Sequence, residues 1–174
     1  MAKPGFSYRA RDSEHFLGAA VDSPKHDKNT SVLFRTGCAT GITSFHAIVG
    51  PMTYEDYRDC PADVAKSWLS VPTHRYDDFE DLFRHMPMAC NLVGVELCDR
   101  AEPLEGFVWP KRSLILLGGE SDGLSKKAIK SCRYMIRLPG SVSMNLSACA
   151  SICIWDYYCK TIVKGVYRNE DDKN

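Results

Sequence analysis

The stretch from Leu114 to Ile152, LILLGGESDGLSKKAIKSCRYMIRLPGSVSMNLSACASI, constrains the fold of this chain more than any other. One apolar segment ends abruptly at Gly118-Gly119, and a second ends at Leu138-Pro139. A glycine-bearing loop follows each segment and runs into a helical pattern. Two strands that end in such loops bring backbone N–H and C=O groups to a place where they can hold a small ligand. The stretch therefore predicts a ligand site at two strand ends.

Apolar strands and helices alternate along the rest of the chain as well. We expect strands at residues 15–21, 44–49, 91–97, 114–117 and 133–138. We expect helices at residues 29–39, 62–68, 79–85, 124–131 and 143–167, with Asn29 as the N-cap of the first. This alternation indicates an α/β fold, a mostly parallel sheet flanked by helices. The length of 174 residues favours a single domain, 1–174, with loosely ordered tails at 1–14 and 168–174.

The composition excludes several classes of protein. No apolar run approaches the ~18 residues that a membrane-spanning helix needs, and the first residues lack the apolar core of a signal peptide. We therefore expect a cytoplasmic protein that does not contact a membrane. The eight cysteines show no Cys-x2-Cys spacing, so we expect free thiols and no metal. The closest cysteine pattern, Cys149, Cys153 and Cys159, fits buried thiols in an apolar helix better than a zinc site.

The formal net charge of zero hides an uneven distribution along the chain. Residues 61–110 hold 4 Lys/Arg and 9 Asp/Glu, a net charge of −5, whereas residues 111–174 hold 11 and 6, a net charge of +5. Six of the basic residues flank the glycine loops in sequence: Lys111, Arg112, Lys126, Lys127, Lys130 and Arg133. A basic cluster beside a ligand site fits a polyanionic substrate such as RNA, although a solvated helix face explains it equally well.

Common catalytic motifs are absent from the glycine loops. Gly118 and Gly123 have the spacing of a phosphate-binding P-loop, but Leu124-Ser125 stands where that motif has Lys-Ser/Thr. The missing lysine argues against a nucleotide-binding module of that type. No G-x-G-x-x-G follows a strand, and no G-x-S-x-G is present, so dinucleotide binding and serine hydrolysis are disfavoured.

Three segments in order resemble the motifs of the SpoU/TrmH branch of the SPOUT superfamily. Residues 28–41, KNTSVLFRTGCATG, resemble the first motif, with an Asn six residues before an Arg at a helix start. LILLGGESDGLS resembles the second motif, L-x-L-G-x-E-x-x-G-L, and RLPGSVSMNLSACASI resembles the third. The resemblance extends over about residues 15–160 and implies an S-adenosylmethionine-dependent methyltransferase that acts on the ribose 2′-OH of tRNA or rRNA.

The same resemblance implies a fold and a cofactor site. In the family, the C-terminal segment threads a loop as a trefoil knot, an exception to the rule that chains avoid knots. The cofactor, S-adenosylmethionine without a metal, is held in the knot mainly by backbone groups. By motif position, the residues that would bind it here are Val95, Glu96, Gly118, Gly119, Leu138, Ser143 and Met144.

The resemblance also assigns the catalytic candidates Arg35, Asn29, Glu120 and Asn145. In the family, the arginine is proposed to activate the 2′-OH, yet a guanidinium is almost always protonated and is a poor general base. Arg35 can instead position a phosphate and stabilise the forming alkoxide. Glu120 would tie the cofactor loop or a partner subunit in place. Asn29 and Asn145 would orient the site, although both also suit a helix N-cap.

The last helix predicts self-association. Apolar residues from Leu146 to Val163 recur on nearly every face of this helix, and one small sheet covers only one face. We therefore expect a homodimer through the C-terminal helix. The alternative to a methyltransferase is a knotted RNA-binding protein without catalysis. Substrate RNA, target nucleotide, general base and the role of the acidic segment 61–110 stay open at this stage.

Overall fold

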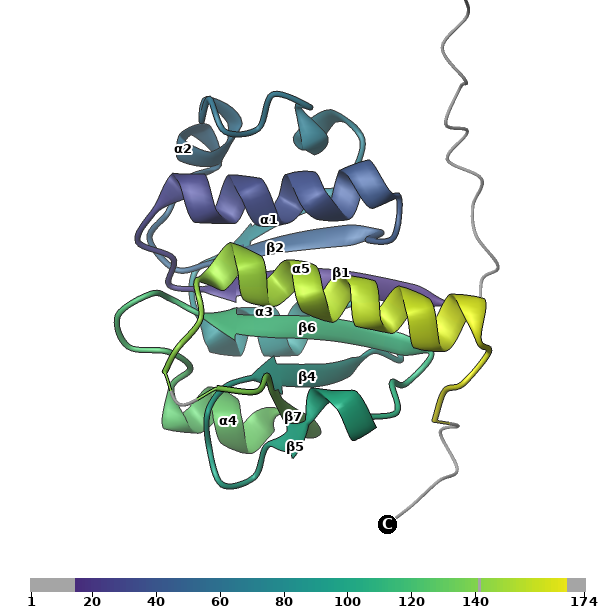
Figure 1. The fold of residues 1–174 in the computed structure, drawn as a ribbon. Helices are drawn as coiled ribbons and strands as arrows, with labels where there is room; N and C mark the ends of the chain where they lie inside the picture. Colours follow the sequence, from purple (N-terminus) through teal and green to yellow (C-terminus); the bar gives the residue numbers. More distant parts are fainter. Residues whose placement is uncertain (1–14, 141, 169–174) are drawn as a thin grey trace, which may run out of the picture.

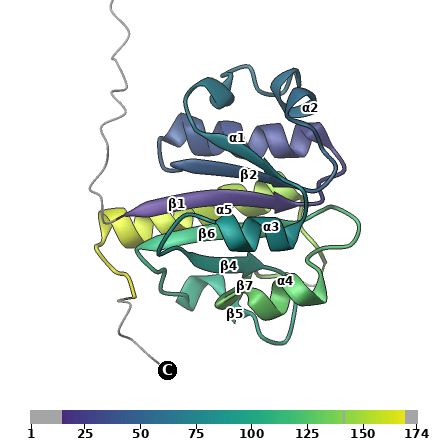
Figure 2. The same cartoon turned by 180° about the vertical axis from the view of Figure 1, so that it is seen from behind.

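The computed structural model describes residues 15–140 and 142–168 as a sheet of seven strands between two layers of helices (Figures 1 and 2). Its strands are β1 (Phe16–Asp22), β2 (Phe45–Val49), β3 (Thr73–Tyr76), β4 (Asn91–Val95), β5 (Glu102–Pro103), β6 (Arg112–Gly118) and β7 (Tyr134–Arg137). The strand order is β3-β2-β1-β6-β4-β7-β5, and every neighbouring pair is parallel. The predicted α/β class with a mostly parallel sheet is confirmed.

Helices cover both faces of this sheet. α1 (Asp27–Thr40) and α5 (Leu146–Tyr157) lie on one face, and α3 (Phe79–His85) and α4 (Lys126–Ser131) lie on the other (Figures 1 and 2). Strands buried on both faces need continuous apolar runs. In β6, Ile115 and Leu117 pack into the core under α1 and α5, while Leu114 and Leu116 pack into the core under α3 and α4. The central position of this strand brings its carboxyl end, Gly118, to the middle of one sheet edge.

The N-terminus of α1 differs from the prediction. The helix begins at Asp27, and its N-cap position is His26, whose side chain makes no capping hydrogen bond. The prediction of Asn29 as N-cap was therefore wrong, because Asn29 lies inside the first turn of the helix. The helix ends as expected at Gly41, which adopts the left-handed conformation with φ of 61°. Placing Asn29 within the helix leaves its amide free to bond to other parts of the chain.

The segment between β2 and α3 also differs. The helix expected at 62–68 is wrong: α2 (Tyr54–Arg58) lies earlier, and only a 3₁₀ turn, Ser67–Leu69, occurs later. A reciprocal capping box between Thr53 and Asp56 starts α2. β3 was not predicted, because this edge strand, THRY, is partly exposed and has no apolar alternation. Its backbone pairing with β2 defines it instead.

The last two helices begin later than expected. Ser125 caps α4 by accepting a hydrogen bond from the Ala128 N–H. Asn145 caps α5, and this helix runs to Tyr157 and continues as a π-helix, Tyr158–Val163. Only part of α5 is covered within the chain: Ile152 and Trp155 remain 42% and 58% exposed. The apolar surface that predicts self-association is therefore present on this helix.

The chain ends of the described part have their own contacts. The Arg168 N–H donates to the Trp109 carbonyl at 2.8 Å, and its guanidinium bonds to Glu102 at 3.0 Å. Of the tails predicted at 1–14 and 168–174, all residues except Arg168 lie outside the described residues. Among the described residues, no helix is long and apolar enough to cross a membrane.

Candidate functional site

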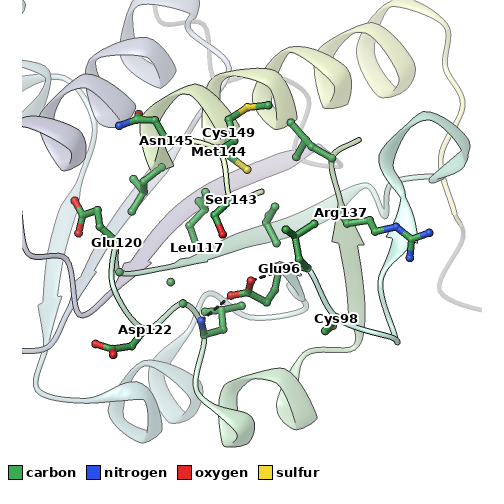
Figure 3. A pocket seen from close by; sticks show the side chains of 18 of the residues that line it. Glu96, Cys98, Leu117, Glu120, Asp122, Arg137, Ser143, Met144, Asn145 and Cys149 are labelled. Carbon is green, nitrogen blue, oxygen red and sulfur yellow. Dashed lines mark hydrogen bonds between the residues drawn. The ribbon is translucent and has the colours of Figure 1, made fainter. Parts of the chain in front are cut away.

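A cavity of about 560 Å³ opens at the carboxyl ends of β4, β6 and β7 (Figure 3). Three loops that follow these strands form most of its wall, and the first turn of α5 closes one side. The cavity is lined by residues 95–98, 117–124, 129, 137–139, 142–146 and 149. Ligands of open α/β proteins bind at this edge of the sheet, where loops from neighbouring strands meet. The ligand site predicted at the strand ends therefore corresponds to a real cavity.

Glycines let the loop after β6 fold tightly against its neighbours. A Cβ atom at Gly118 would clash with the backbone of Gly123 and Leu124, and one at Gly119 would clash with the carbonyl of Ser23. Gly123 has a φ of 62°, and its N–H donates to the Gly119 carbonyl at 3.1 Å. Glycine at positions 118, 119 and 123 therefore permits a close backbone approach, which brings backbone groups to the cavity wall.

The Glu96 side chain joins two of the three loops. Its Oε1 accepts a hydrogen bond from the Leu97 N–H at 2.9 Å, and its Oε2 accepts one from the Leu124 N–H at 2.9 Å (Figure 3). Glu96 is half-buried, and a side chain at Gly123 would collide with its carboxylate. The loop after β4 is thus held to the loop after β6 by a charged group inside the cavity.

A second network connects the cavity to the start of α1. Glu120 lines the cavity, and its carboxylate accepts hydrogen bonds from the Asn29 side-chain amide at 2.8 Å and the Lys25 N–H at 2.9 Å. Asn145 also lines the cavity, caps α5, and donates its amide to the Asn29 Oδ1 at 3.1 Å. Three residues far apart in the sequence are therefore linked by two direct hydrogen bonds.

The ionisation of Glu120 follows from its surroundings. Partial burial of the Glu120 carboxyl group raises its pKa. The hydrogen bonds from the Asn29 amide and the Lys25 N–H together lower the pKa by more than burial raises it, so the net pKa lies below the ordinary value. Glu120 is therefore a carboxylate at neutral pH, and both of its oxygens are occupied as acceptors. This arrangement suits a fixed structural link between loops better than a proton acceptor.

Arg35 lies apart from the cavity. It is exposed on α1, and its guanidinium donates to the Ala62 carbonyl at 3.3 Å. Arg35 follows Asn29 by six positions, so it lies ~9 Å further along the helix and about 120° around its axis. Within one chain, the structure brings Asn29, Glu120 and Asn145 together and does not bring Arg35 to them.

The other predicted cofactor residues all lie on the cavity wall. Besides Glu96, these are Val95, Gly118, Gly119, Leu138, Ser143 and Met144. Further residues line the cavity that were not predicted from the sequence, among them Cys98, Arg137 and Cys149. Arg137 lies at the end of β7, one of the two strand ends that located the site in sequence, and Cys98 lies in the loop after β4. Cys149 reaches the cavity only because α5 packs beside it. The Arg137 guanidinium points away from the cavity and donates to the Ala101 carbonyl at 2.7 Å (Figure 3).

The basic cluster predicted beside the glycine loops is divided in space. Lys126, Lys127 and Lys130 lie on α4 near the cavity, where Lys127 is paired with Glu80. Lys111 and Arg112 lie at the opposite end of β6, some 20 Å from its carboxyl end. The expectation of one cluster was wrong, because a strand separates residues that are close in sequence. In residues 15–140 and 142–168, no three His, Cys, Asp or Glu side chains form a group that could hold a metal.

The fold and the cavity define a class: α/β proteins with a parallel sheet that place a small-ligand site at the carboxyl edge, between three strand-end loops. A model of the SpoU rRNA Methylase family matches residues 17–155 of the sequence. The chain belongs to this family, as the three sequence motifs predicted. A comparison with curated protein sequences found no match.

Solved structures share the fold. The AdoMet-bound rRNA methyltransferase from Sinorhizobium meliloti superposes with a TM-score of 0.74 at 22% identity, covering 83% of this chain and 56% of that one. The A. aeolicus TrmH/SpoU tRNA modifying enzyme gives a TM-score of 0.74 at 17% identity, covering 91% and 80%. A structure concerned with 2-OH methylation of C/U34 on tRNA superposes with a TM-score of 0.71 at 19% sequence identity, and the match covers 86% of this chain and 99% of that one. This chain thus spans about half of the first structure and nearly all of the last.

Proposed function

We propose that this protein is an S-adenosylmethionine-dependent methyltransferase that acts on the 2′-OH of ribose in tRNA or rRNA. The observation that carries the proposal is the network from Asn29 through Glu120 to the cavity. The hydrogen bond between Asn29 and Glu120 joins the first family motif to the second, and the hydrogen bond from Asn145 to Asn29 joins the third motif to the first. Residues of three motifs far apart in the sequence are therefore linked beside one cavity, as a shared chemical task requires.

The cavity fits the cofactor in size and in construction. A volume of about 560 Å³ is within the usual range of small-molecule sites, roughly 300–1,000 Å³. Gly118 and Gly119 let the loop after β6 pack directly against the backbone of Gly123, Leu124 and Ser23, which any side chain there would displace, so the loop can form the cavity wall. Apolar side chains, including Leu117, Leu138 and Met144, supply surface for an uncharged ring. The residues that would hold the cofactor are those that the motifs predict.

The chain's own residues would supply positioning rather than acid–base chemistry. When bound, S-adenosylmethionine supplies a methyl group on a positively charged sulfur, a leaving group that needs no metal. Glu120 holds the loop after β6 against α1, and Asn145 fixes the start of α5. Arg35 would bind the RNA phosphate and stabilise negative charge on the ribose oxygen. The 2′-OH proton would then leave by a route other than the guanidinium.

A homodimer would bring further residues to the site. Arg35 lies on α1, which packs against α5: the Ser151 hydroxyl donates to the Thr36 Oγ1 at 3.4 Å. Ile152 and Trp155 form exposed apolar surface on α5. We propose that a second copy covers this surface and that Arg35 serves a site formed between the two copies. A monomer in light scattering at micromolar concentration would refute this part of the proposal.

We also propose the trefoil knot of the family for the segment that follows β7. The cavity wall supports it, since the loops after β4, β6 and β7 converge there and α5 leaves from the last of them. Tethering the two chain ends and measuring the hydrodynamic radius in denaturant tests it. With its ends joined and in denaturant, a knotted chain should have a smaller hydrodynamic radius than an unknotted control protein of equal length treated in the same way. Equal hydrodynamic radii would refute the knot.

The function is tested by methyl transfer from tritiated S-adenosylmethionine to total tRNA and to rRNA. After alkaline hydrolysis of the RNA, tritium that is recovered in a dinucleotide identifies ribose 2′-O-methylation, because a methylated 2′-oxygen cannot cleave the neighbouring phosphodiester bond. Arg35→Ala should abolish transfer. Arg84→Ala is the matched control, because Arg84 is also an exposed helical arginine bonded to a carbonyl at 3.3 Å. RNA binding without cofactor binding would instead support a non-catalytic RNA-binding protein.

A further inference from the structure

The side chain of Glu96 has a place in the cavity that the motifs do not account for. The family motifs concern backbone groups at this position, whereas the structure places a carboxylate inside the cavity, fixed by the Leu97 and Leu124 N–H groups. Two other carboxylates line the cavity, but Glu120 is exposed and the Asp122 side chain is 88% exposed. Glu96 is thus the carboxylate on this wall that is most withdrawn from solvent.

Positive charge on the wall does not offset this carboxylate. Arg137 is the only Lys or Arg among the described lining residues, and its guanidinium is directed to the Ala101 carbonyl, away from the cavity (Figure 3). A carboxylate that is fixed, half-buried and not neutralised from within the cavity favours a ligand with positive charge. The cavity therefore has a charge preference as well as a shape.

We propose that the Glu96 carboxylate makes this site prefer the positively charged S-adenosylmethionine over its uncharged thioether product, S-adenosylhomocysteine. The inference rests on the proposed function, because it concerns the same cofactor. The two molecules differ by one methyl group and by the charge on sulfur, so a preference beyond the contacts of a methyl group reports electrostatics. Glu96 is then the residue that sets cofactor specificity.

The size of the cavity limits how far the charges can be apart. A sphere of 560 Å³ has a radius of ~5 Å, so a ligand atom inside it lies within about 10 Å of a carboxylate on the wall. Two unit charges ~8 Å apart, at an effective dielectric constant of about 30, attract strongly enough to change affinity about tenfold.

The preference has a consequence for turnover. In methyl transfer, the ribose oxygen forms a bond to the methyl carbon while the carbon–sulfur bond breaks, and the electron pair of that bond stays on sulfur. The 2′-OH proton passes to water. The sulfur therefore loses its positive charge, and the attraction to Glu96 ends at the moment when the product must leave.

The test compares three ligands by calorimetric titration of the wild-type protein: S-adenosylmethionine, S-adenosylhomocysteine and sinefungin, in which a carbon bearing an amine replaces the methylated sulfur. The two charged ligands should bind about tenfold more tightly than S-adenosylhomocysteine. Equal affinities for all three would overturn the inference and leave the proposed function intact. Absence of binding by all three would overturn both.

Variants then assign the preference to one side chain. Glu96→Gln should bring the affinity ratio between S-adenosylmethionine and S-adenosylhomocysteine close to one, whereas Asp122→Asn, on the same wall but exposed, should keep it. Glu96→Gln also alters one backbone contact, so its thermal unfolding is measured alongside. An equal loss of affinity for both ligands in Glu96→Gln would assign Glu96 to a part that the ligands share and overturn the inference.

Discussion

Replacing Gly118 with alanine is the sharpest test of how the cavity is built. The new Cβ would lie well inside 3.0 Å of the Gly123 and Leu124 backbone, whereas carbon atoms pack at ~3.5–4.0 Å. The atoms in the way belong to the backbone of Gly123 and Leu124, so the clash cannot be relieved by rotation of a side chain and the loop itself must shift. Inserting a methyl group into a filled space costs about 1–3 kcal/mol, and we expect the upper end here. At about 2–4 °C per kcal/mol for a chain of this size, the Tm should fall by about 6–12 °C.

Gly106→Ala is the matched control for this substitution. A Cβ at Gly106 would have no atom within 4 Å, so the Tm should change by about 1–2 °C at most. Thermal unfolding of both variants is followed by circular dichroism, and the affinity for S-adenosylhomocysteine is measured by calorimetry. Gly118→Ala should bind at least about tenfold more weakly, because the loop after β6 forms the cavity wall. Wild-type stability and wild-type affinity in Gly118→Ala would refute this account of the loop.

Three further predictions concern other parts of the molecule. Burial lowers the pKa of His46 in the folded protein from the ordinary value of 6.5 to about 3. As the pH falls through 6.5, the His46 imidazole therefore gains a proton in the unfolded chain but not in the folded one, which favours unfolding. The free energy of unfolding in urea should be about 2 kcal/mol lower at pH 5 than at pH 7.5. If His46→Phe loses the same free energy of unfolding between these two pH values, His46 is not the cause. Trp155→Glu should give monomers in light scattering, whereas Phe83→Glu, on the other face of the sheet, should not. Glu120→Gln should lower methyl transfer at least about tenfold with little change in Tm; wild-type transfer would show that the link to Asn29 is dispensable.

The sheet was predictable wherever a strand is buried on both faces. Runs such as LILL at 114–117 are recognisable because a central parallel strand needs apolar side chains on both sides. β3 was missed because an edge strand is defined by backbone hydrogen bonds to β2, to which side-chain identity contributes little. The start of α1 was misplaced for a related reason. Asn29 is a favourable N-cap residue, but its amide bonds to Glu120 and Asn145, which only tertiary packing brings near.

The sequence alone determined the class of fold, the family, and the strand ends at which a ligand would be held. These properties depend on local patterns: apolar runs, glycines that permit close approach, and motif spacing. Tertiary structure decided which side chains share the site. It placed Glu96 inside the cavity, linked Asn29 to Glu120, set Arg35 apart on another face of α1, and separated Lys111 and Arg112 from the glycine loops. Contacts between residues distant in sequence depend on how strands are ordered across the sheet, and no local pattern encodes that order.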